Sequence, residues 1–269
     1  MAKQRPIGVY DSGVGGLTVV RWLQQALPTE QVMYFGDTAR VPYGGRPASE
    51  IIEFSRQILT FFLDLDVKFV IAACNTSSAL ALPVLNPGAP IPMMGVIRSG
   101  AQAAVVGTKG RRIGVIGTEG TVQSHAYGHA LRAIAPDISV WEVACPKLVP
   151  LIEAGQWEGE AIEALLADYL SPLMDQKIDT LILGCTHYPF LLSSIERLLG
   201  PRVQIIDPGE ATAQEATLRL RELDLVADEK RGENGFYVSG DPHHFRASAL
   251  RLGYDHPVKH VDIERYAMG

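Results

Sequence analysis

The chain has little cysteine, no long hydrophobic run and no large excess of one charge, and each shortage excludes a class of protein. Three cysteines in 269 residues are an odd number and too few for a disulfide scaffold. No apolar run approaches the ~20 residues of a membrane span, and segment 1–13 has no signal-peptide core. A net charge of −6 argues against a nucleic-acid surface. We expect a soluble cytoplasmic protein, without membrane or nucleic-acid partners, whose few thiols need an explanation.

Composition then points to a folded protein with a substantial core. The chain is 47% hydrophobic and 20% charged, a balance that excludes disordered, collagen-like and coiled-coil proteins. At about 150 residues per domain, its length corresponds to roughly 1.8 domains.

Short apolar runs alternate with amphipathic stretches along the chain. Several runs are rich in β-branched residues and predict buried strands at 7–10, 31–35, 68–73, 91–96, 112–116, 180–183 and 203–206. Helical spacing of apolar residues predicts helices at 17–27, at 51–65 after a start signal at Ser49, and at 188–199. Segment 224–234 is polar and predicts an exposed loop. Strand–helix alternation of this kind is typical of βαβ units, so we predict an α/β protein with mainly parallel sheets.

The sequence also contains a weak internal repeat. Segment 7–13 is similar to 113–119, and segment 69–76 is similar to 180–187. Each half therefore has one strand that ends in a small polar turn and a later strand that ends in a cysteine. Two such halves facing each other would place Cys74 and Cys185 across one cleft, although similar apolar strands also recur by chance in α/β proteins.

The glycine-rich turn at 11–16 follows a predicted strand and precedes a predicted helix. A dinucleotide fingerprint would need a glycine at position 18, where the sequence has Thr18, and an acidic residue about 20 positions on, where Asp37 is the nearest. The turn instead suits a carboxylate or phosphate held by backbone amides. Asp11 is a candidate base or orienting group, and an N-cap is the structural alternative.

The segments Cys74-Asn75-Thr76 and Cys185-Thr186-His187 carry the strongest chemical signal. Two thiols in matched positions can serve a reaction in which one removes a proton from carbon and the other returns a proton to the opposite face. Free cysteine is often a buried core residue, but both of these are followed directly by polar residues. Asparagine and threonine side chains suit the recognition of amino and carboxylate groups.

Three other kinds of site compete with this interpretation. The sequence has neither the CxxC spacing that is typical of zinc sites and redox pairs nor an HExxH motif, so we predict no metal. Pyridoxal phosphate needs a Schiff-base lysine, and none of the seven lysines lies in the strand-end motifs. A reaction without a cofactor therefore fits better.

Seven segments, in order, resemble bacterial glutamate racemase of the aspartate/glutamate racemase family. They are IGVYDSGVGGLTV, YFGDTARVPYGGRP, VIAACNTSSA, IGVIGTEGTV, ACPKLVPLIEAG, LILGCTHYPFL and IDPGEA, and FYVSGDP near the C-terminus also matches. The resemblance implies two pseudosymmetric three-layer α/β domains with the active site between them. It places the first domain at 1–97 plus 208–269 and the second at 98–207.

The resemblance also implies roles for individual residues. Cys74 would deprotonate D-glutamate and Cys185 would deprotonate L-glutamate, assisted by Asp11 and His187, with Glu153 supporting the histidine. Expected substrate contacts are Asp11, Ser12, Tyr43, Gly44, Asn75, Thr76, Thr118, Thr121, Thr186 and His187. Cys145 has no counterpart in the repeat and is expected to be a packing residue. Arg40, Arg46 and Arg98 are expected to be surface or interface charges.

The same resemblance implies a homodimer without a cofactor that supplies D-glutamate for peptidoglycan synthesis, and so serves cell-wall biogenesis and cell shape. The chain has no long N-terminal extension of the kind found in members activated by a cell-wall nucleotide, so we do not expect that activation. An aspartate racemase is the nearest alternative enzyme. A topoisomerase-inhibiting binding protein is the alternative of a different class, and more plausible as a secondary role.

Overall fold

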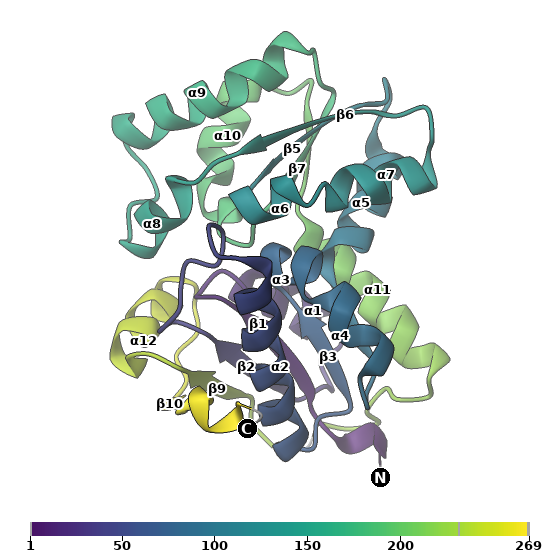
Figure 1. Ribbon diagram of the computed structural model, residues 1–269, viewed down its shortest axis with the longest axis vertical. Helices are drawn as coiled ribbons and strands as arrows, with labels where there is room; N and C mark the ends of the chain where they lie inside the picture. Colours follow the sequence, from purple (N-terminus) through teal and green to yellow (C-terminus); the bar gives the residue numbers. More distant parts are fainter. Residues whose placement is uncertain (1, 231, 268–269) are drawn as a thin grey trace.

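The chain folds into two parallel β-sheets, each covered by helices (Figure 1). The computed structural model describes residues 2–230 and 232–267. The strand order is β10-β9-β2-β1-β3-β4 in the larger sheet and β6-β5-β7-β8 in the smaller. Every strand pair in the described part of the chain is parallel. The strands are β1 (Ile7–Asp11), β2 (Val32–Gly36), β3 (Phe69–Ala72), β4 (Met93–Gly95), β5 (Arg112–Gly117), β6 (Ser139–Ala144), β7 (Thr180–Gly184), β8 (Gln204–Ile206), β9 (Gly235–Val238) and β10 (Val258–His260).

Helices connect the strands and cover both faces of each sheet. The α-helices are α1 (Leu17–Ala26), α2 (Ala48–Asp64), α3 (Asn75–Leu80), α4 (Leu82–Leu85), α5 (Val96–Gly107), α6 (Glu119–Gln123), α7 (Ala126–Ile134), α8 (Leu148–Glu153), α9 (Glu160–Asp175), α10 (Leu192–Leu199), α11 (Pro208–Glu222) and α12 (Pro242–Arg251). The 3-10 helices are η1 (Ala2–Gln4), η2 (Asn86–Gly88), η3 (Tyr188–Leu191) and η4 (Ile263–Tyr266). The α/β class and the mainly parallel sheets predicted from the sequence are confirmed.

The first lobe, defined here as the larger sheet with its helices, has three layers. Ile7 and Val9 of β1 are fully buried in a cluster with side chains of α1, α11 and α12. Tyr10 belongs to a different cluster, with α2 and η4. Because neighbouring residues of a strand point to opposite faces, β1 supplies apolar side chains to both layers of helices.

The second lobe, defined as the smaller sheet with its helices, is built in the same way. Leu181 and Leu183 of β7 pack with α8, α9 and α10, whereas Ile182 packs with α5 and α7. The strand order β2-β1-β3-β4 of the first lobe has the same connectivity as β6-β5-β7-β8 of the second. The internal repeat seen in the sequence therefore corresponds to a repeated supersecondary structure.

Helices α5 and α11 pack against each other at the junction of the two lobes (Figure 1). The Ser99 hydroxyl of α5 donates a hydrogen bond to Oε2 of Glu215 in α11 at 2.6 Å. The expected domain boundaries fall within α5 at Ile97 and at Asp207, the N-cap residue of α11. The division into 1–97 plus 208–269 and 98–207 stays a prediction.

All seven predicted strands are present, and so are the three predicted helices, of which the first begins at Leu17 as predicted. The second predicted helix begins at Ala48 after Pro47, so Ser49 lies in its first turn and does not cap it. The third divides into η3 and α10. Segment 224–234 has no helix or strand among its described residues, but Ala227 is buried and its N–H donates to Glu30. Of the helices in the described chain, none is long and apolar enough to cross a membrane.

Candidate active site

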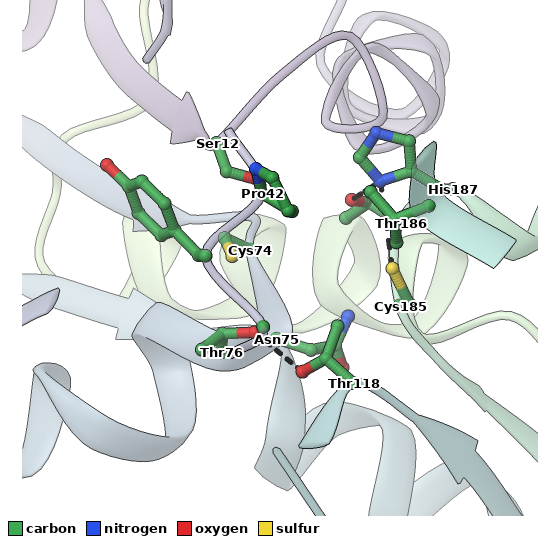
Figure 2. Close-up of a pocket in the computed structure, with 12 residues that line it drawn as sticks. Ser12, Pro42, Cys74, Asn75, Thr76, Thr118, Cys185, Thr186 and His187 are labelled. Atoms are coloured by element: carbon green, nitrogen blue, oxygen red, sulfur yellow. Dashed lines mark hydrogen bonds between the residues drawn. The ribbon is translucent and has the colours of Figure 1, made fainter. Parts of the chain in front are cut away.

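The two matched cysteines come together in one pocket between the lobes (Figure 2). Cys74 follows β3 and is the N-cap residue of α3, and Cys185 follows β7 directly. Parallel strands carry the residues after them to the same edge of a sheet, and the two sheets face each other with these edges. Both thiols are buried, and Figure 2 shows them on opposite sides of the pocket.

The pocket walls contain most of the substrate contacts expected from the sequence. The free space between them is about 10 Å³, which is roughly the room that one water needs. Pro42 and Val149 also line the pocket and were not among the predicted contacts. The predicted residues that line it are Ser12, Tyr43, Gly44, Cys74, Asn75, Thr76, Thr118, Cys185, Thr186 and His187.

Three predicted residues lie one hydrogen bond behind the walls. The Thr186 hydroxyl donates to Oδ2 of Asp11 at 2.9 Å. Oε1 of Glu153 lies 2.5 Å from Nε2 of His187. The Thr118 hydroxyl donates to Thr121 Oγ1 at 3.0 Å. Asp11, Glu153 and Thr121 can therefore act on a molecule in the pocket through the side chains in front of them, and their roles stay predictions.

The surroundings of Cys74 favour the neutral thiol. Burial raises the pKa of Cys74 to about 12, and the negative charge of Asp11 acts in the same direction. Hydrogen bonds from Ser77 oppose this shift. In the free protein Cys74 therefore keeps its proton near neutral pH and is a proton donor to the pocket.

Cys185 belongs to a chain of polar contacts that leads away from the pocket. Its Sγ atom lies 3.6 Å from Nδ1 of His187, and the other imidazole nitrogen contacts Glu153. Burial by itself lowers the pKa of His187, but hydrogen bonds with Cys185 and Glu153 outweigh it and hold that pKa well above its usual range. Burial likewise works to raise the pKa of Glu153, yet contact with His187 leaves it lowered. The two side chains form a charged pair next to Cys185.

Asp11 occupies a buried position between the two cysteine motifs. Its Oδ1 accepts the N–H of Gly13 at 3.0 Å, and its Oδ2 accepts the Thr186 hydroxyl from the other lobe. Burial raises its pKa, and the charge of His187 opposes that shift. Asp11 was expected, with His187, to assist the two thiols, and its hydrogen-bond partner from the other lobe is Thr186, next to Cys185.

Hydroxyl groups gather at the end of the pocket beside Asn75 and Thr76. Oγ1 of Thr76 lies 2.8 Å from Oγ1 of Thr118, which in turn caps α6 by accepting the N–H of Thr121 at 3.3 Å. The N–H of Gly120 donates to the Gly44 carbonyl at 2.7 Å. These contacts join the two lobes and leave a wall of hydroxyl groups, which can donate hydrogen bonds to an anion.

Asp37, the acidic residue nearest to the position that a dinucleotide fingerprint would need, contacts the pocket residue Tyr43. The carboxylate is fully buried and accepts hydrogen bonds from Tyr43, Ser239 and Arg40. Arg40 was expected to be a surface or interface charge, and the surface part of that expectation is wrong, because its side chain is 13% exposed and lies over the Phe54 ring. A buried carboxylate needs a counter-charge, which explains why Arg40 is turned inward.

Arg98, Arg46 and Cys145 lie where they were expected. Arg98 is 86% exposed, and Arg46 forms a half-exposed ion pair with Glu50. Cys145 is buried in the core of the second lobe, as expected for a packing residue. No cluster of three or more His, Cys, Asp or Glu that could hold a metal exists within the described ranges.

Residues 17–216 match the family of Asp/Glu/Hydantoin racemases. The chain belongs to this racemase family. A glutamate racemase of Trichormus variabilis is 47% identical to this racemase, over 97% of this chain and 89% of that one.

Solved structures agree with that membership. The glutamate racemase isoform RacE1 of Bacillus anthracis has 41% identity and a TM-score of 0.94, over 97% of this racemase and 98% of that chain. The glutamate racemase of Francisella tularensis, solved in complex with D-glutamate, has 37% identity and a TM-score of 0.91, over 98% of this racemase and 100% of that chain. This racemase therefore shares its fold, over almost its full length, with solved structures of glutamate racemases.

Proposed function

We propose that this racemase interconverts L-glutamate and D-glutamate by proton transfer at Cα between two cysteines, without a cofactor. The observation that carries the proposal is a pair of buried thiols on opposite sides of one pocket lined by hydrogen-bond donors. The names of the relatives and the fully matched fold support glutamate as the substrate.

In the proposed reaction each thiol acts on one face of Cα. For D-glutamate, Cys74 first gives up its own proton to solvent. The resulting thiolate takes the α-proton, so that the Cα–H bond breaks, an S–H bond forms and the electron pair stays on the substrate. The Cys185 thiol then gives its proton to the opposite face, so that a new Cα–H bond forms and a thiolate remains at Cys185. In the reverse direction, from L-glutamate, the Cys185 thiolate takes the α-proton and the Cys74 thiol gives its proton to the opposite face. In each direction one proton leaves the substrate and one returns to it.

The roles of the neighbouring groups follow from the same scheme. A protonated His187 can donate from Nδ1 to Cys185 Sγ, which stabilises the negative charge that Cys185 carries before or after its proton transfer. The Glu153 carboxylate stabilises the positive charge on His187. None of the lysines and arginines among the described residues lines the pocket. Amides and hydroxyls, with the charge of His187 behind them, must therefore stabilise the carboxylates and the developing carbanion.

The decisive experiment compares three cysteine variants by chiral analysis of product. Cys74→Ala and Cys185→Ala are each expected to abolish racemisation, and Cys145→Ala is the matched control because its buried thiol lies outside the pocket. In D₂O, the first product molecules should carry deuterium at Cα while the remaining substrate does not. Racemisation by either pocket variant would overturn the two-base proposal, and faster turnover of aspartate would overturn glutamate as the substrate.

We propose further that the protein acts in the cytoplasm as a homodimer and supplies D-glutamate for peptidoglycan. The resemblance to bacterial glutamate racemases supports this setting. Light scattering of the purified protein measures the mass in solution. Growth of a D-glutamate-requiring bacterial strain that carries this chain, compared with the Cys185→Ala variant, tests the supply role.

A further inference from the structure

Tyr127 connects the two cysteine motifs although it lies outside the pocket. It is the second residue of α7 in the second lobe and is fully buried. Its ring lies in a slot between two glycines, where a Cβ on Gly184 would come within 3.2 Å of the ring and one on Gly100 within 3.3 Å. Gly184 directly precedes Cys185. The narrow slot fixes the direction in which the phenol points.

The phenol points at the other cysteine motif. The Tyr127 hydroxyl donates a hydrogen bond of 2.7 Å to Oδ1 of Asn75. Asn75 directly follows Cys74 in the first lobe, is 3% exposed and lines the pocket. The contact therefore joins the lobes through a side chain that faces the substrate space.

This hydrogen bond decides which end of the Asn75 amide faces the pocket. An asparagine amide has one acceptor oxygen and one donor nitrogen, and the two ends exchange places when the amide rotates by half a turn. With Oδ1 occupied by the phenol, the Nδ2 group is left for the pocket. Burial raises the pKa of Tyr127 well above its usual value, so the hydroxyl keeps the proton that it donates.

We propose that Tyr127 is a positioning residue for the racemase, because its hydroxyl holds the Asn75 amide with Nδ2 available to a substrate carboxylate. The inference rests on the glutamate racemisation proposed above. A rotated amide would present Oδ1 to an anion and repel it. Since the contact crosses between the lobes, the donor is fixed only when the lobes are closed around the substrate.

A double-mutant cycle separates this role from simple packing. Tyr127→Phe keeps the ring in its slot and removes only the hydroxyl, and it is expected to raise the KM for both enantiomers about fivefold, the equivalent of one net hydrogen bond. The expected change in kcat is less than twofold. In an Asn75→Ala background the same Tyr127→Phe change should alter KM by less than twofold, because no amide remains to be held.

Two further variants sharpen the result. Asn75→Asp replaces the Nδ2 donor by an acceptor, and its KM should rise by at least tenfold while Tyr127 is intact. Tyr254→Phe is the control, because it removes a buried hydroxyl that donates to the Leu17 carbonyl at 3.3 Å within the first lobe. Thermal unfolding of each variant identifies any general loss of structure.

The outcomes distinguish the two proposals. Equal effects of Tyr127→Phe in the native and Asn75→Ala backgrounds, or no effect in the native one, would overturn the role of Tyr127 alone. Absence of glutamate racemisation by the unaltered protein would overturn the proposed function and this inference with it.

Discussion

Oε1 of Glu153 lies 2.5 Å from Nε2 of His187 and also accepts the N–H of Val14 from the other lobe at 3.3 Å. One carboxylate oxygen therefore holds the imidazole beside Cys185 and contacts the glycine-rich turn that carries Asp11 and Ser12. His187 is 1% exposed and the Glu153 side chain is 17% exposed, so solvent screens this pair only weakly.

Glu153→Gln is expected to lower the pKa of His187, because the neutral amide can still contact Nε2 but no longer stabilises a positive charge. A neutral His187 stabilises charge on Cys185 less well, so kcat should fall about tenfold at neutral pH. NMR titration of the imidazole and steady-state kinetics measure the two effects. Glu163→Gln, which breaks the exposed pair with Arg197, is the control. An unchanged His187 titration would contradict the assignment.

The position of the two thiols could be predicted from the sequence because it depends on local patterns. A run of apolar residues that ends in Cys-Asn-Thr or Cys-Thr-His gives both the strand and the place where the strand stops. Parallel pairing then brings all such ends to one edge of each sheet. The repeat added the relation between Cys74 and Cys185, since each half carries its cysteine after the equivalent strand.

The supporting contacts could not be predicted because they depend on burial that no local pattern records. Arg40 looks like any arginine in a polar turn, and only the folded chain shows it paired with Asp37 over Phe54. Tyr127 looks like one apolar residue of an amphipathic helix, and its role depends on an amide from the other lobe. Strand β6 was also missed, since none of its residues is fully buried and its apolar signal is weak.

Asp37→Asn is expected to destabilise the protein by about 3 kcal/mol, the typical cost of leaving one partner of a buried ion pair without its counter-charge. Because Tyr43 donates to the same carboxylate and lines the pocket, KM for glutamate should also rise. Urea unfolding and kinetics measure the two effects. Arg46→Ala breaks the half-exposed pair with Glu50 and should cost less than about 1 kcal/mol. Equal costs for the two variants would refute the special role of Asp37.

The raised pKa of Cys74 predicts a loss of stability in alkaline solution. The thiol has an ordinary pKa of 9.0 and a pKa of about 12 in the fold. Between pH 9 and pH 12 the unfolded chain releases the Cys74 proton and the folded chain keeps it. The contribution of Cys74 to the free energy of unfolding is therefore fully present below pH 9 and declines as the pH rises toward 12. The slope from one such group is at most about 1.4 kcal/mol per pH unit. Urea unfolding from pH 8 to 10.5 should therefore show a shallower decline for Cys74→Ala than for the unaltered protein. Parallel declines would contradict the raised pKa.

Arg251 of the first lobe contacts Trp157 and Gly155 of the second lobe. The Arg251 guanidinium of α12 lies 3.6 Å from the centre of the Trp157 ring in the second lobe, and its Nη1 donates to the Gly155 carbonyl at 3.2 Å. Trp157 stacks on Phe190 at 4.7 Å, three residues after His187. Because the pocket has room for roughly one water, we expect the lobes to separate when glutamate enters.

Arg251→Ala is expected to shift the protein toward the open state. An exposed cation–π contact contributes roughly 0.5–1 kcal/mol, so KM should rise about two- to fivefold. The kcat value should stay equal or increase, because product leaves more easily once the lobes part more readily. Arg265→Ala is the matched control, since its guanidinium lies over the Tyr266 ring within the first lobe.

Steady-state kinetics in both directions measure the effect of Arg251→Ala on KM and kcat. Because the two enantiomers have equal free energy in solution, kcat/KM must change by one common factor in both directions, which checks the data internally. A KM equal to that of the unaltered protein would show that the Arg251–Trp157 contact does not hold the lobes closed.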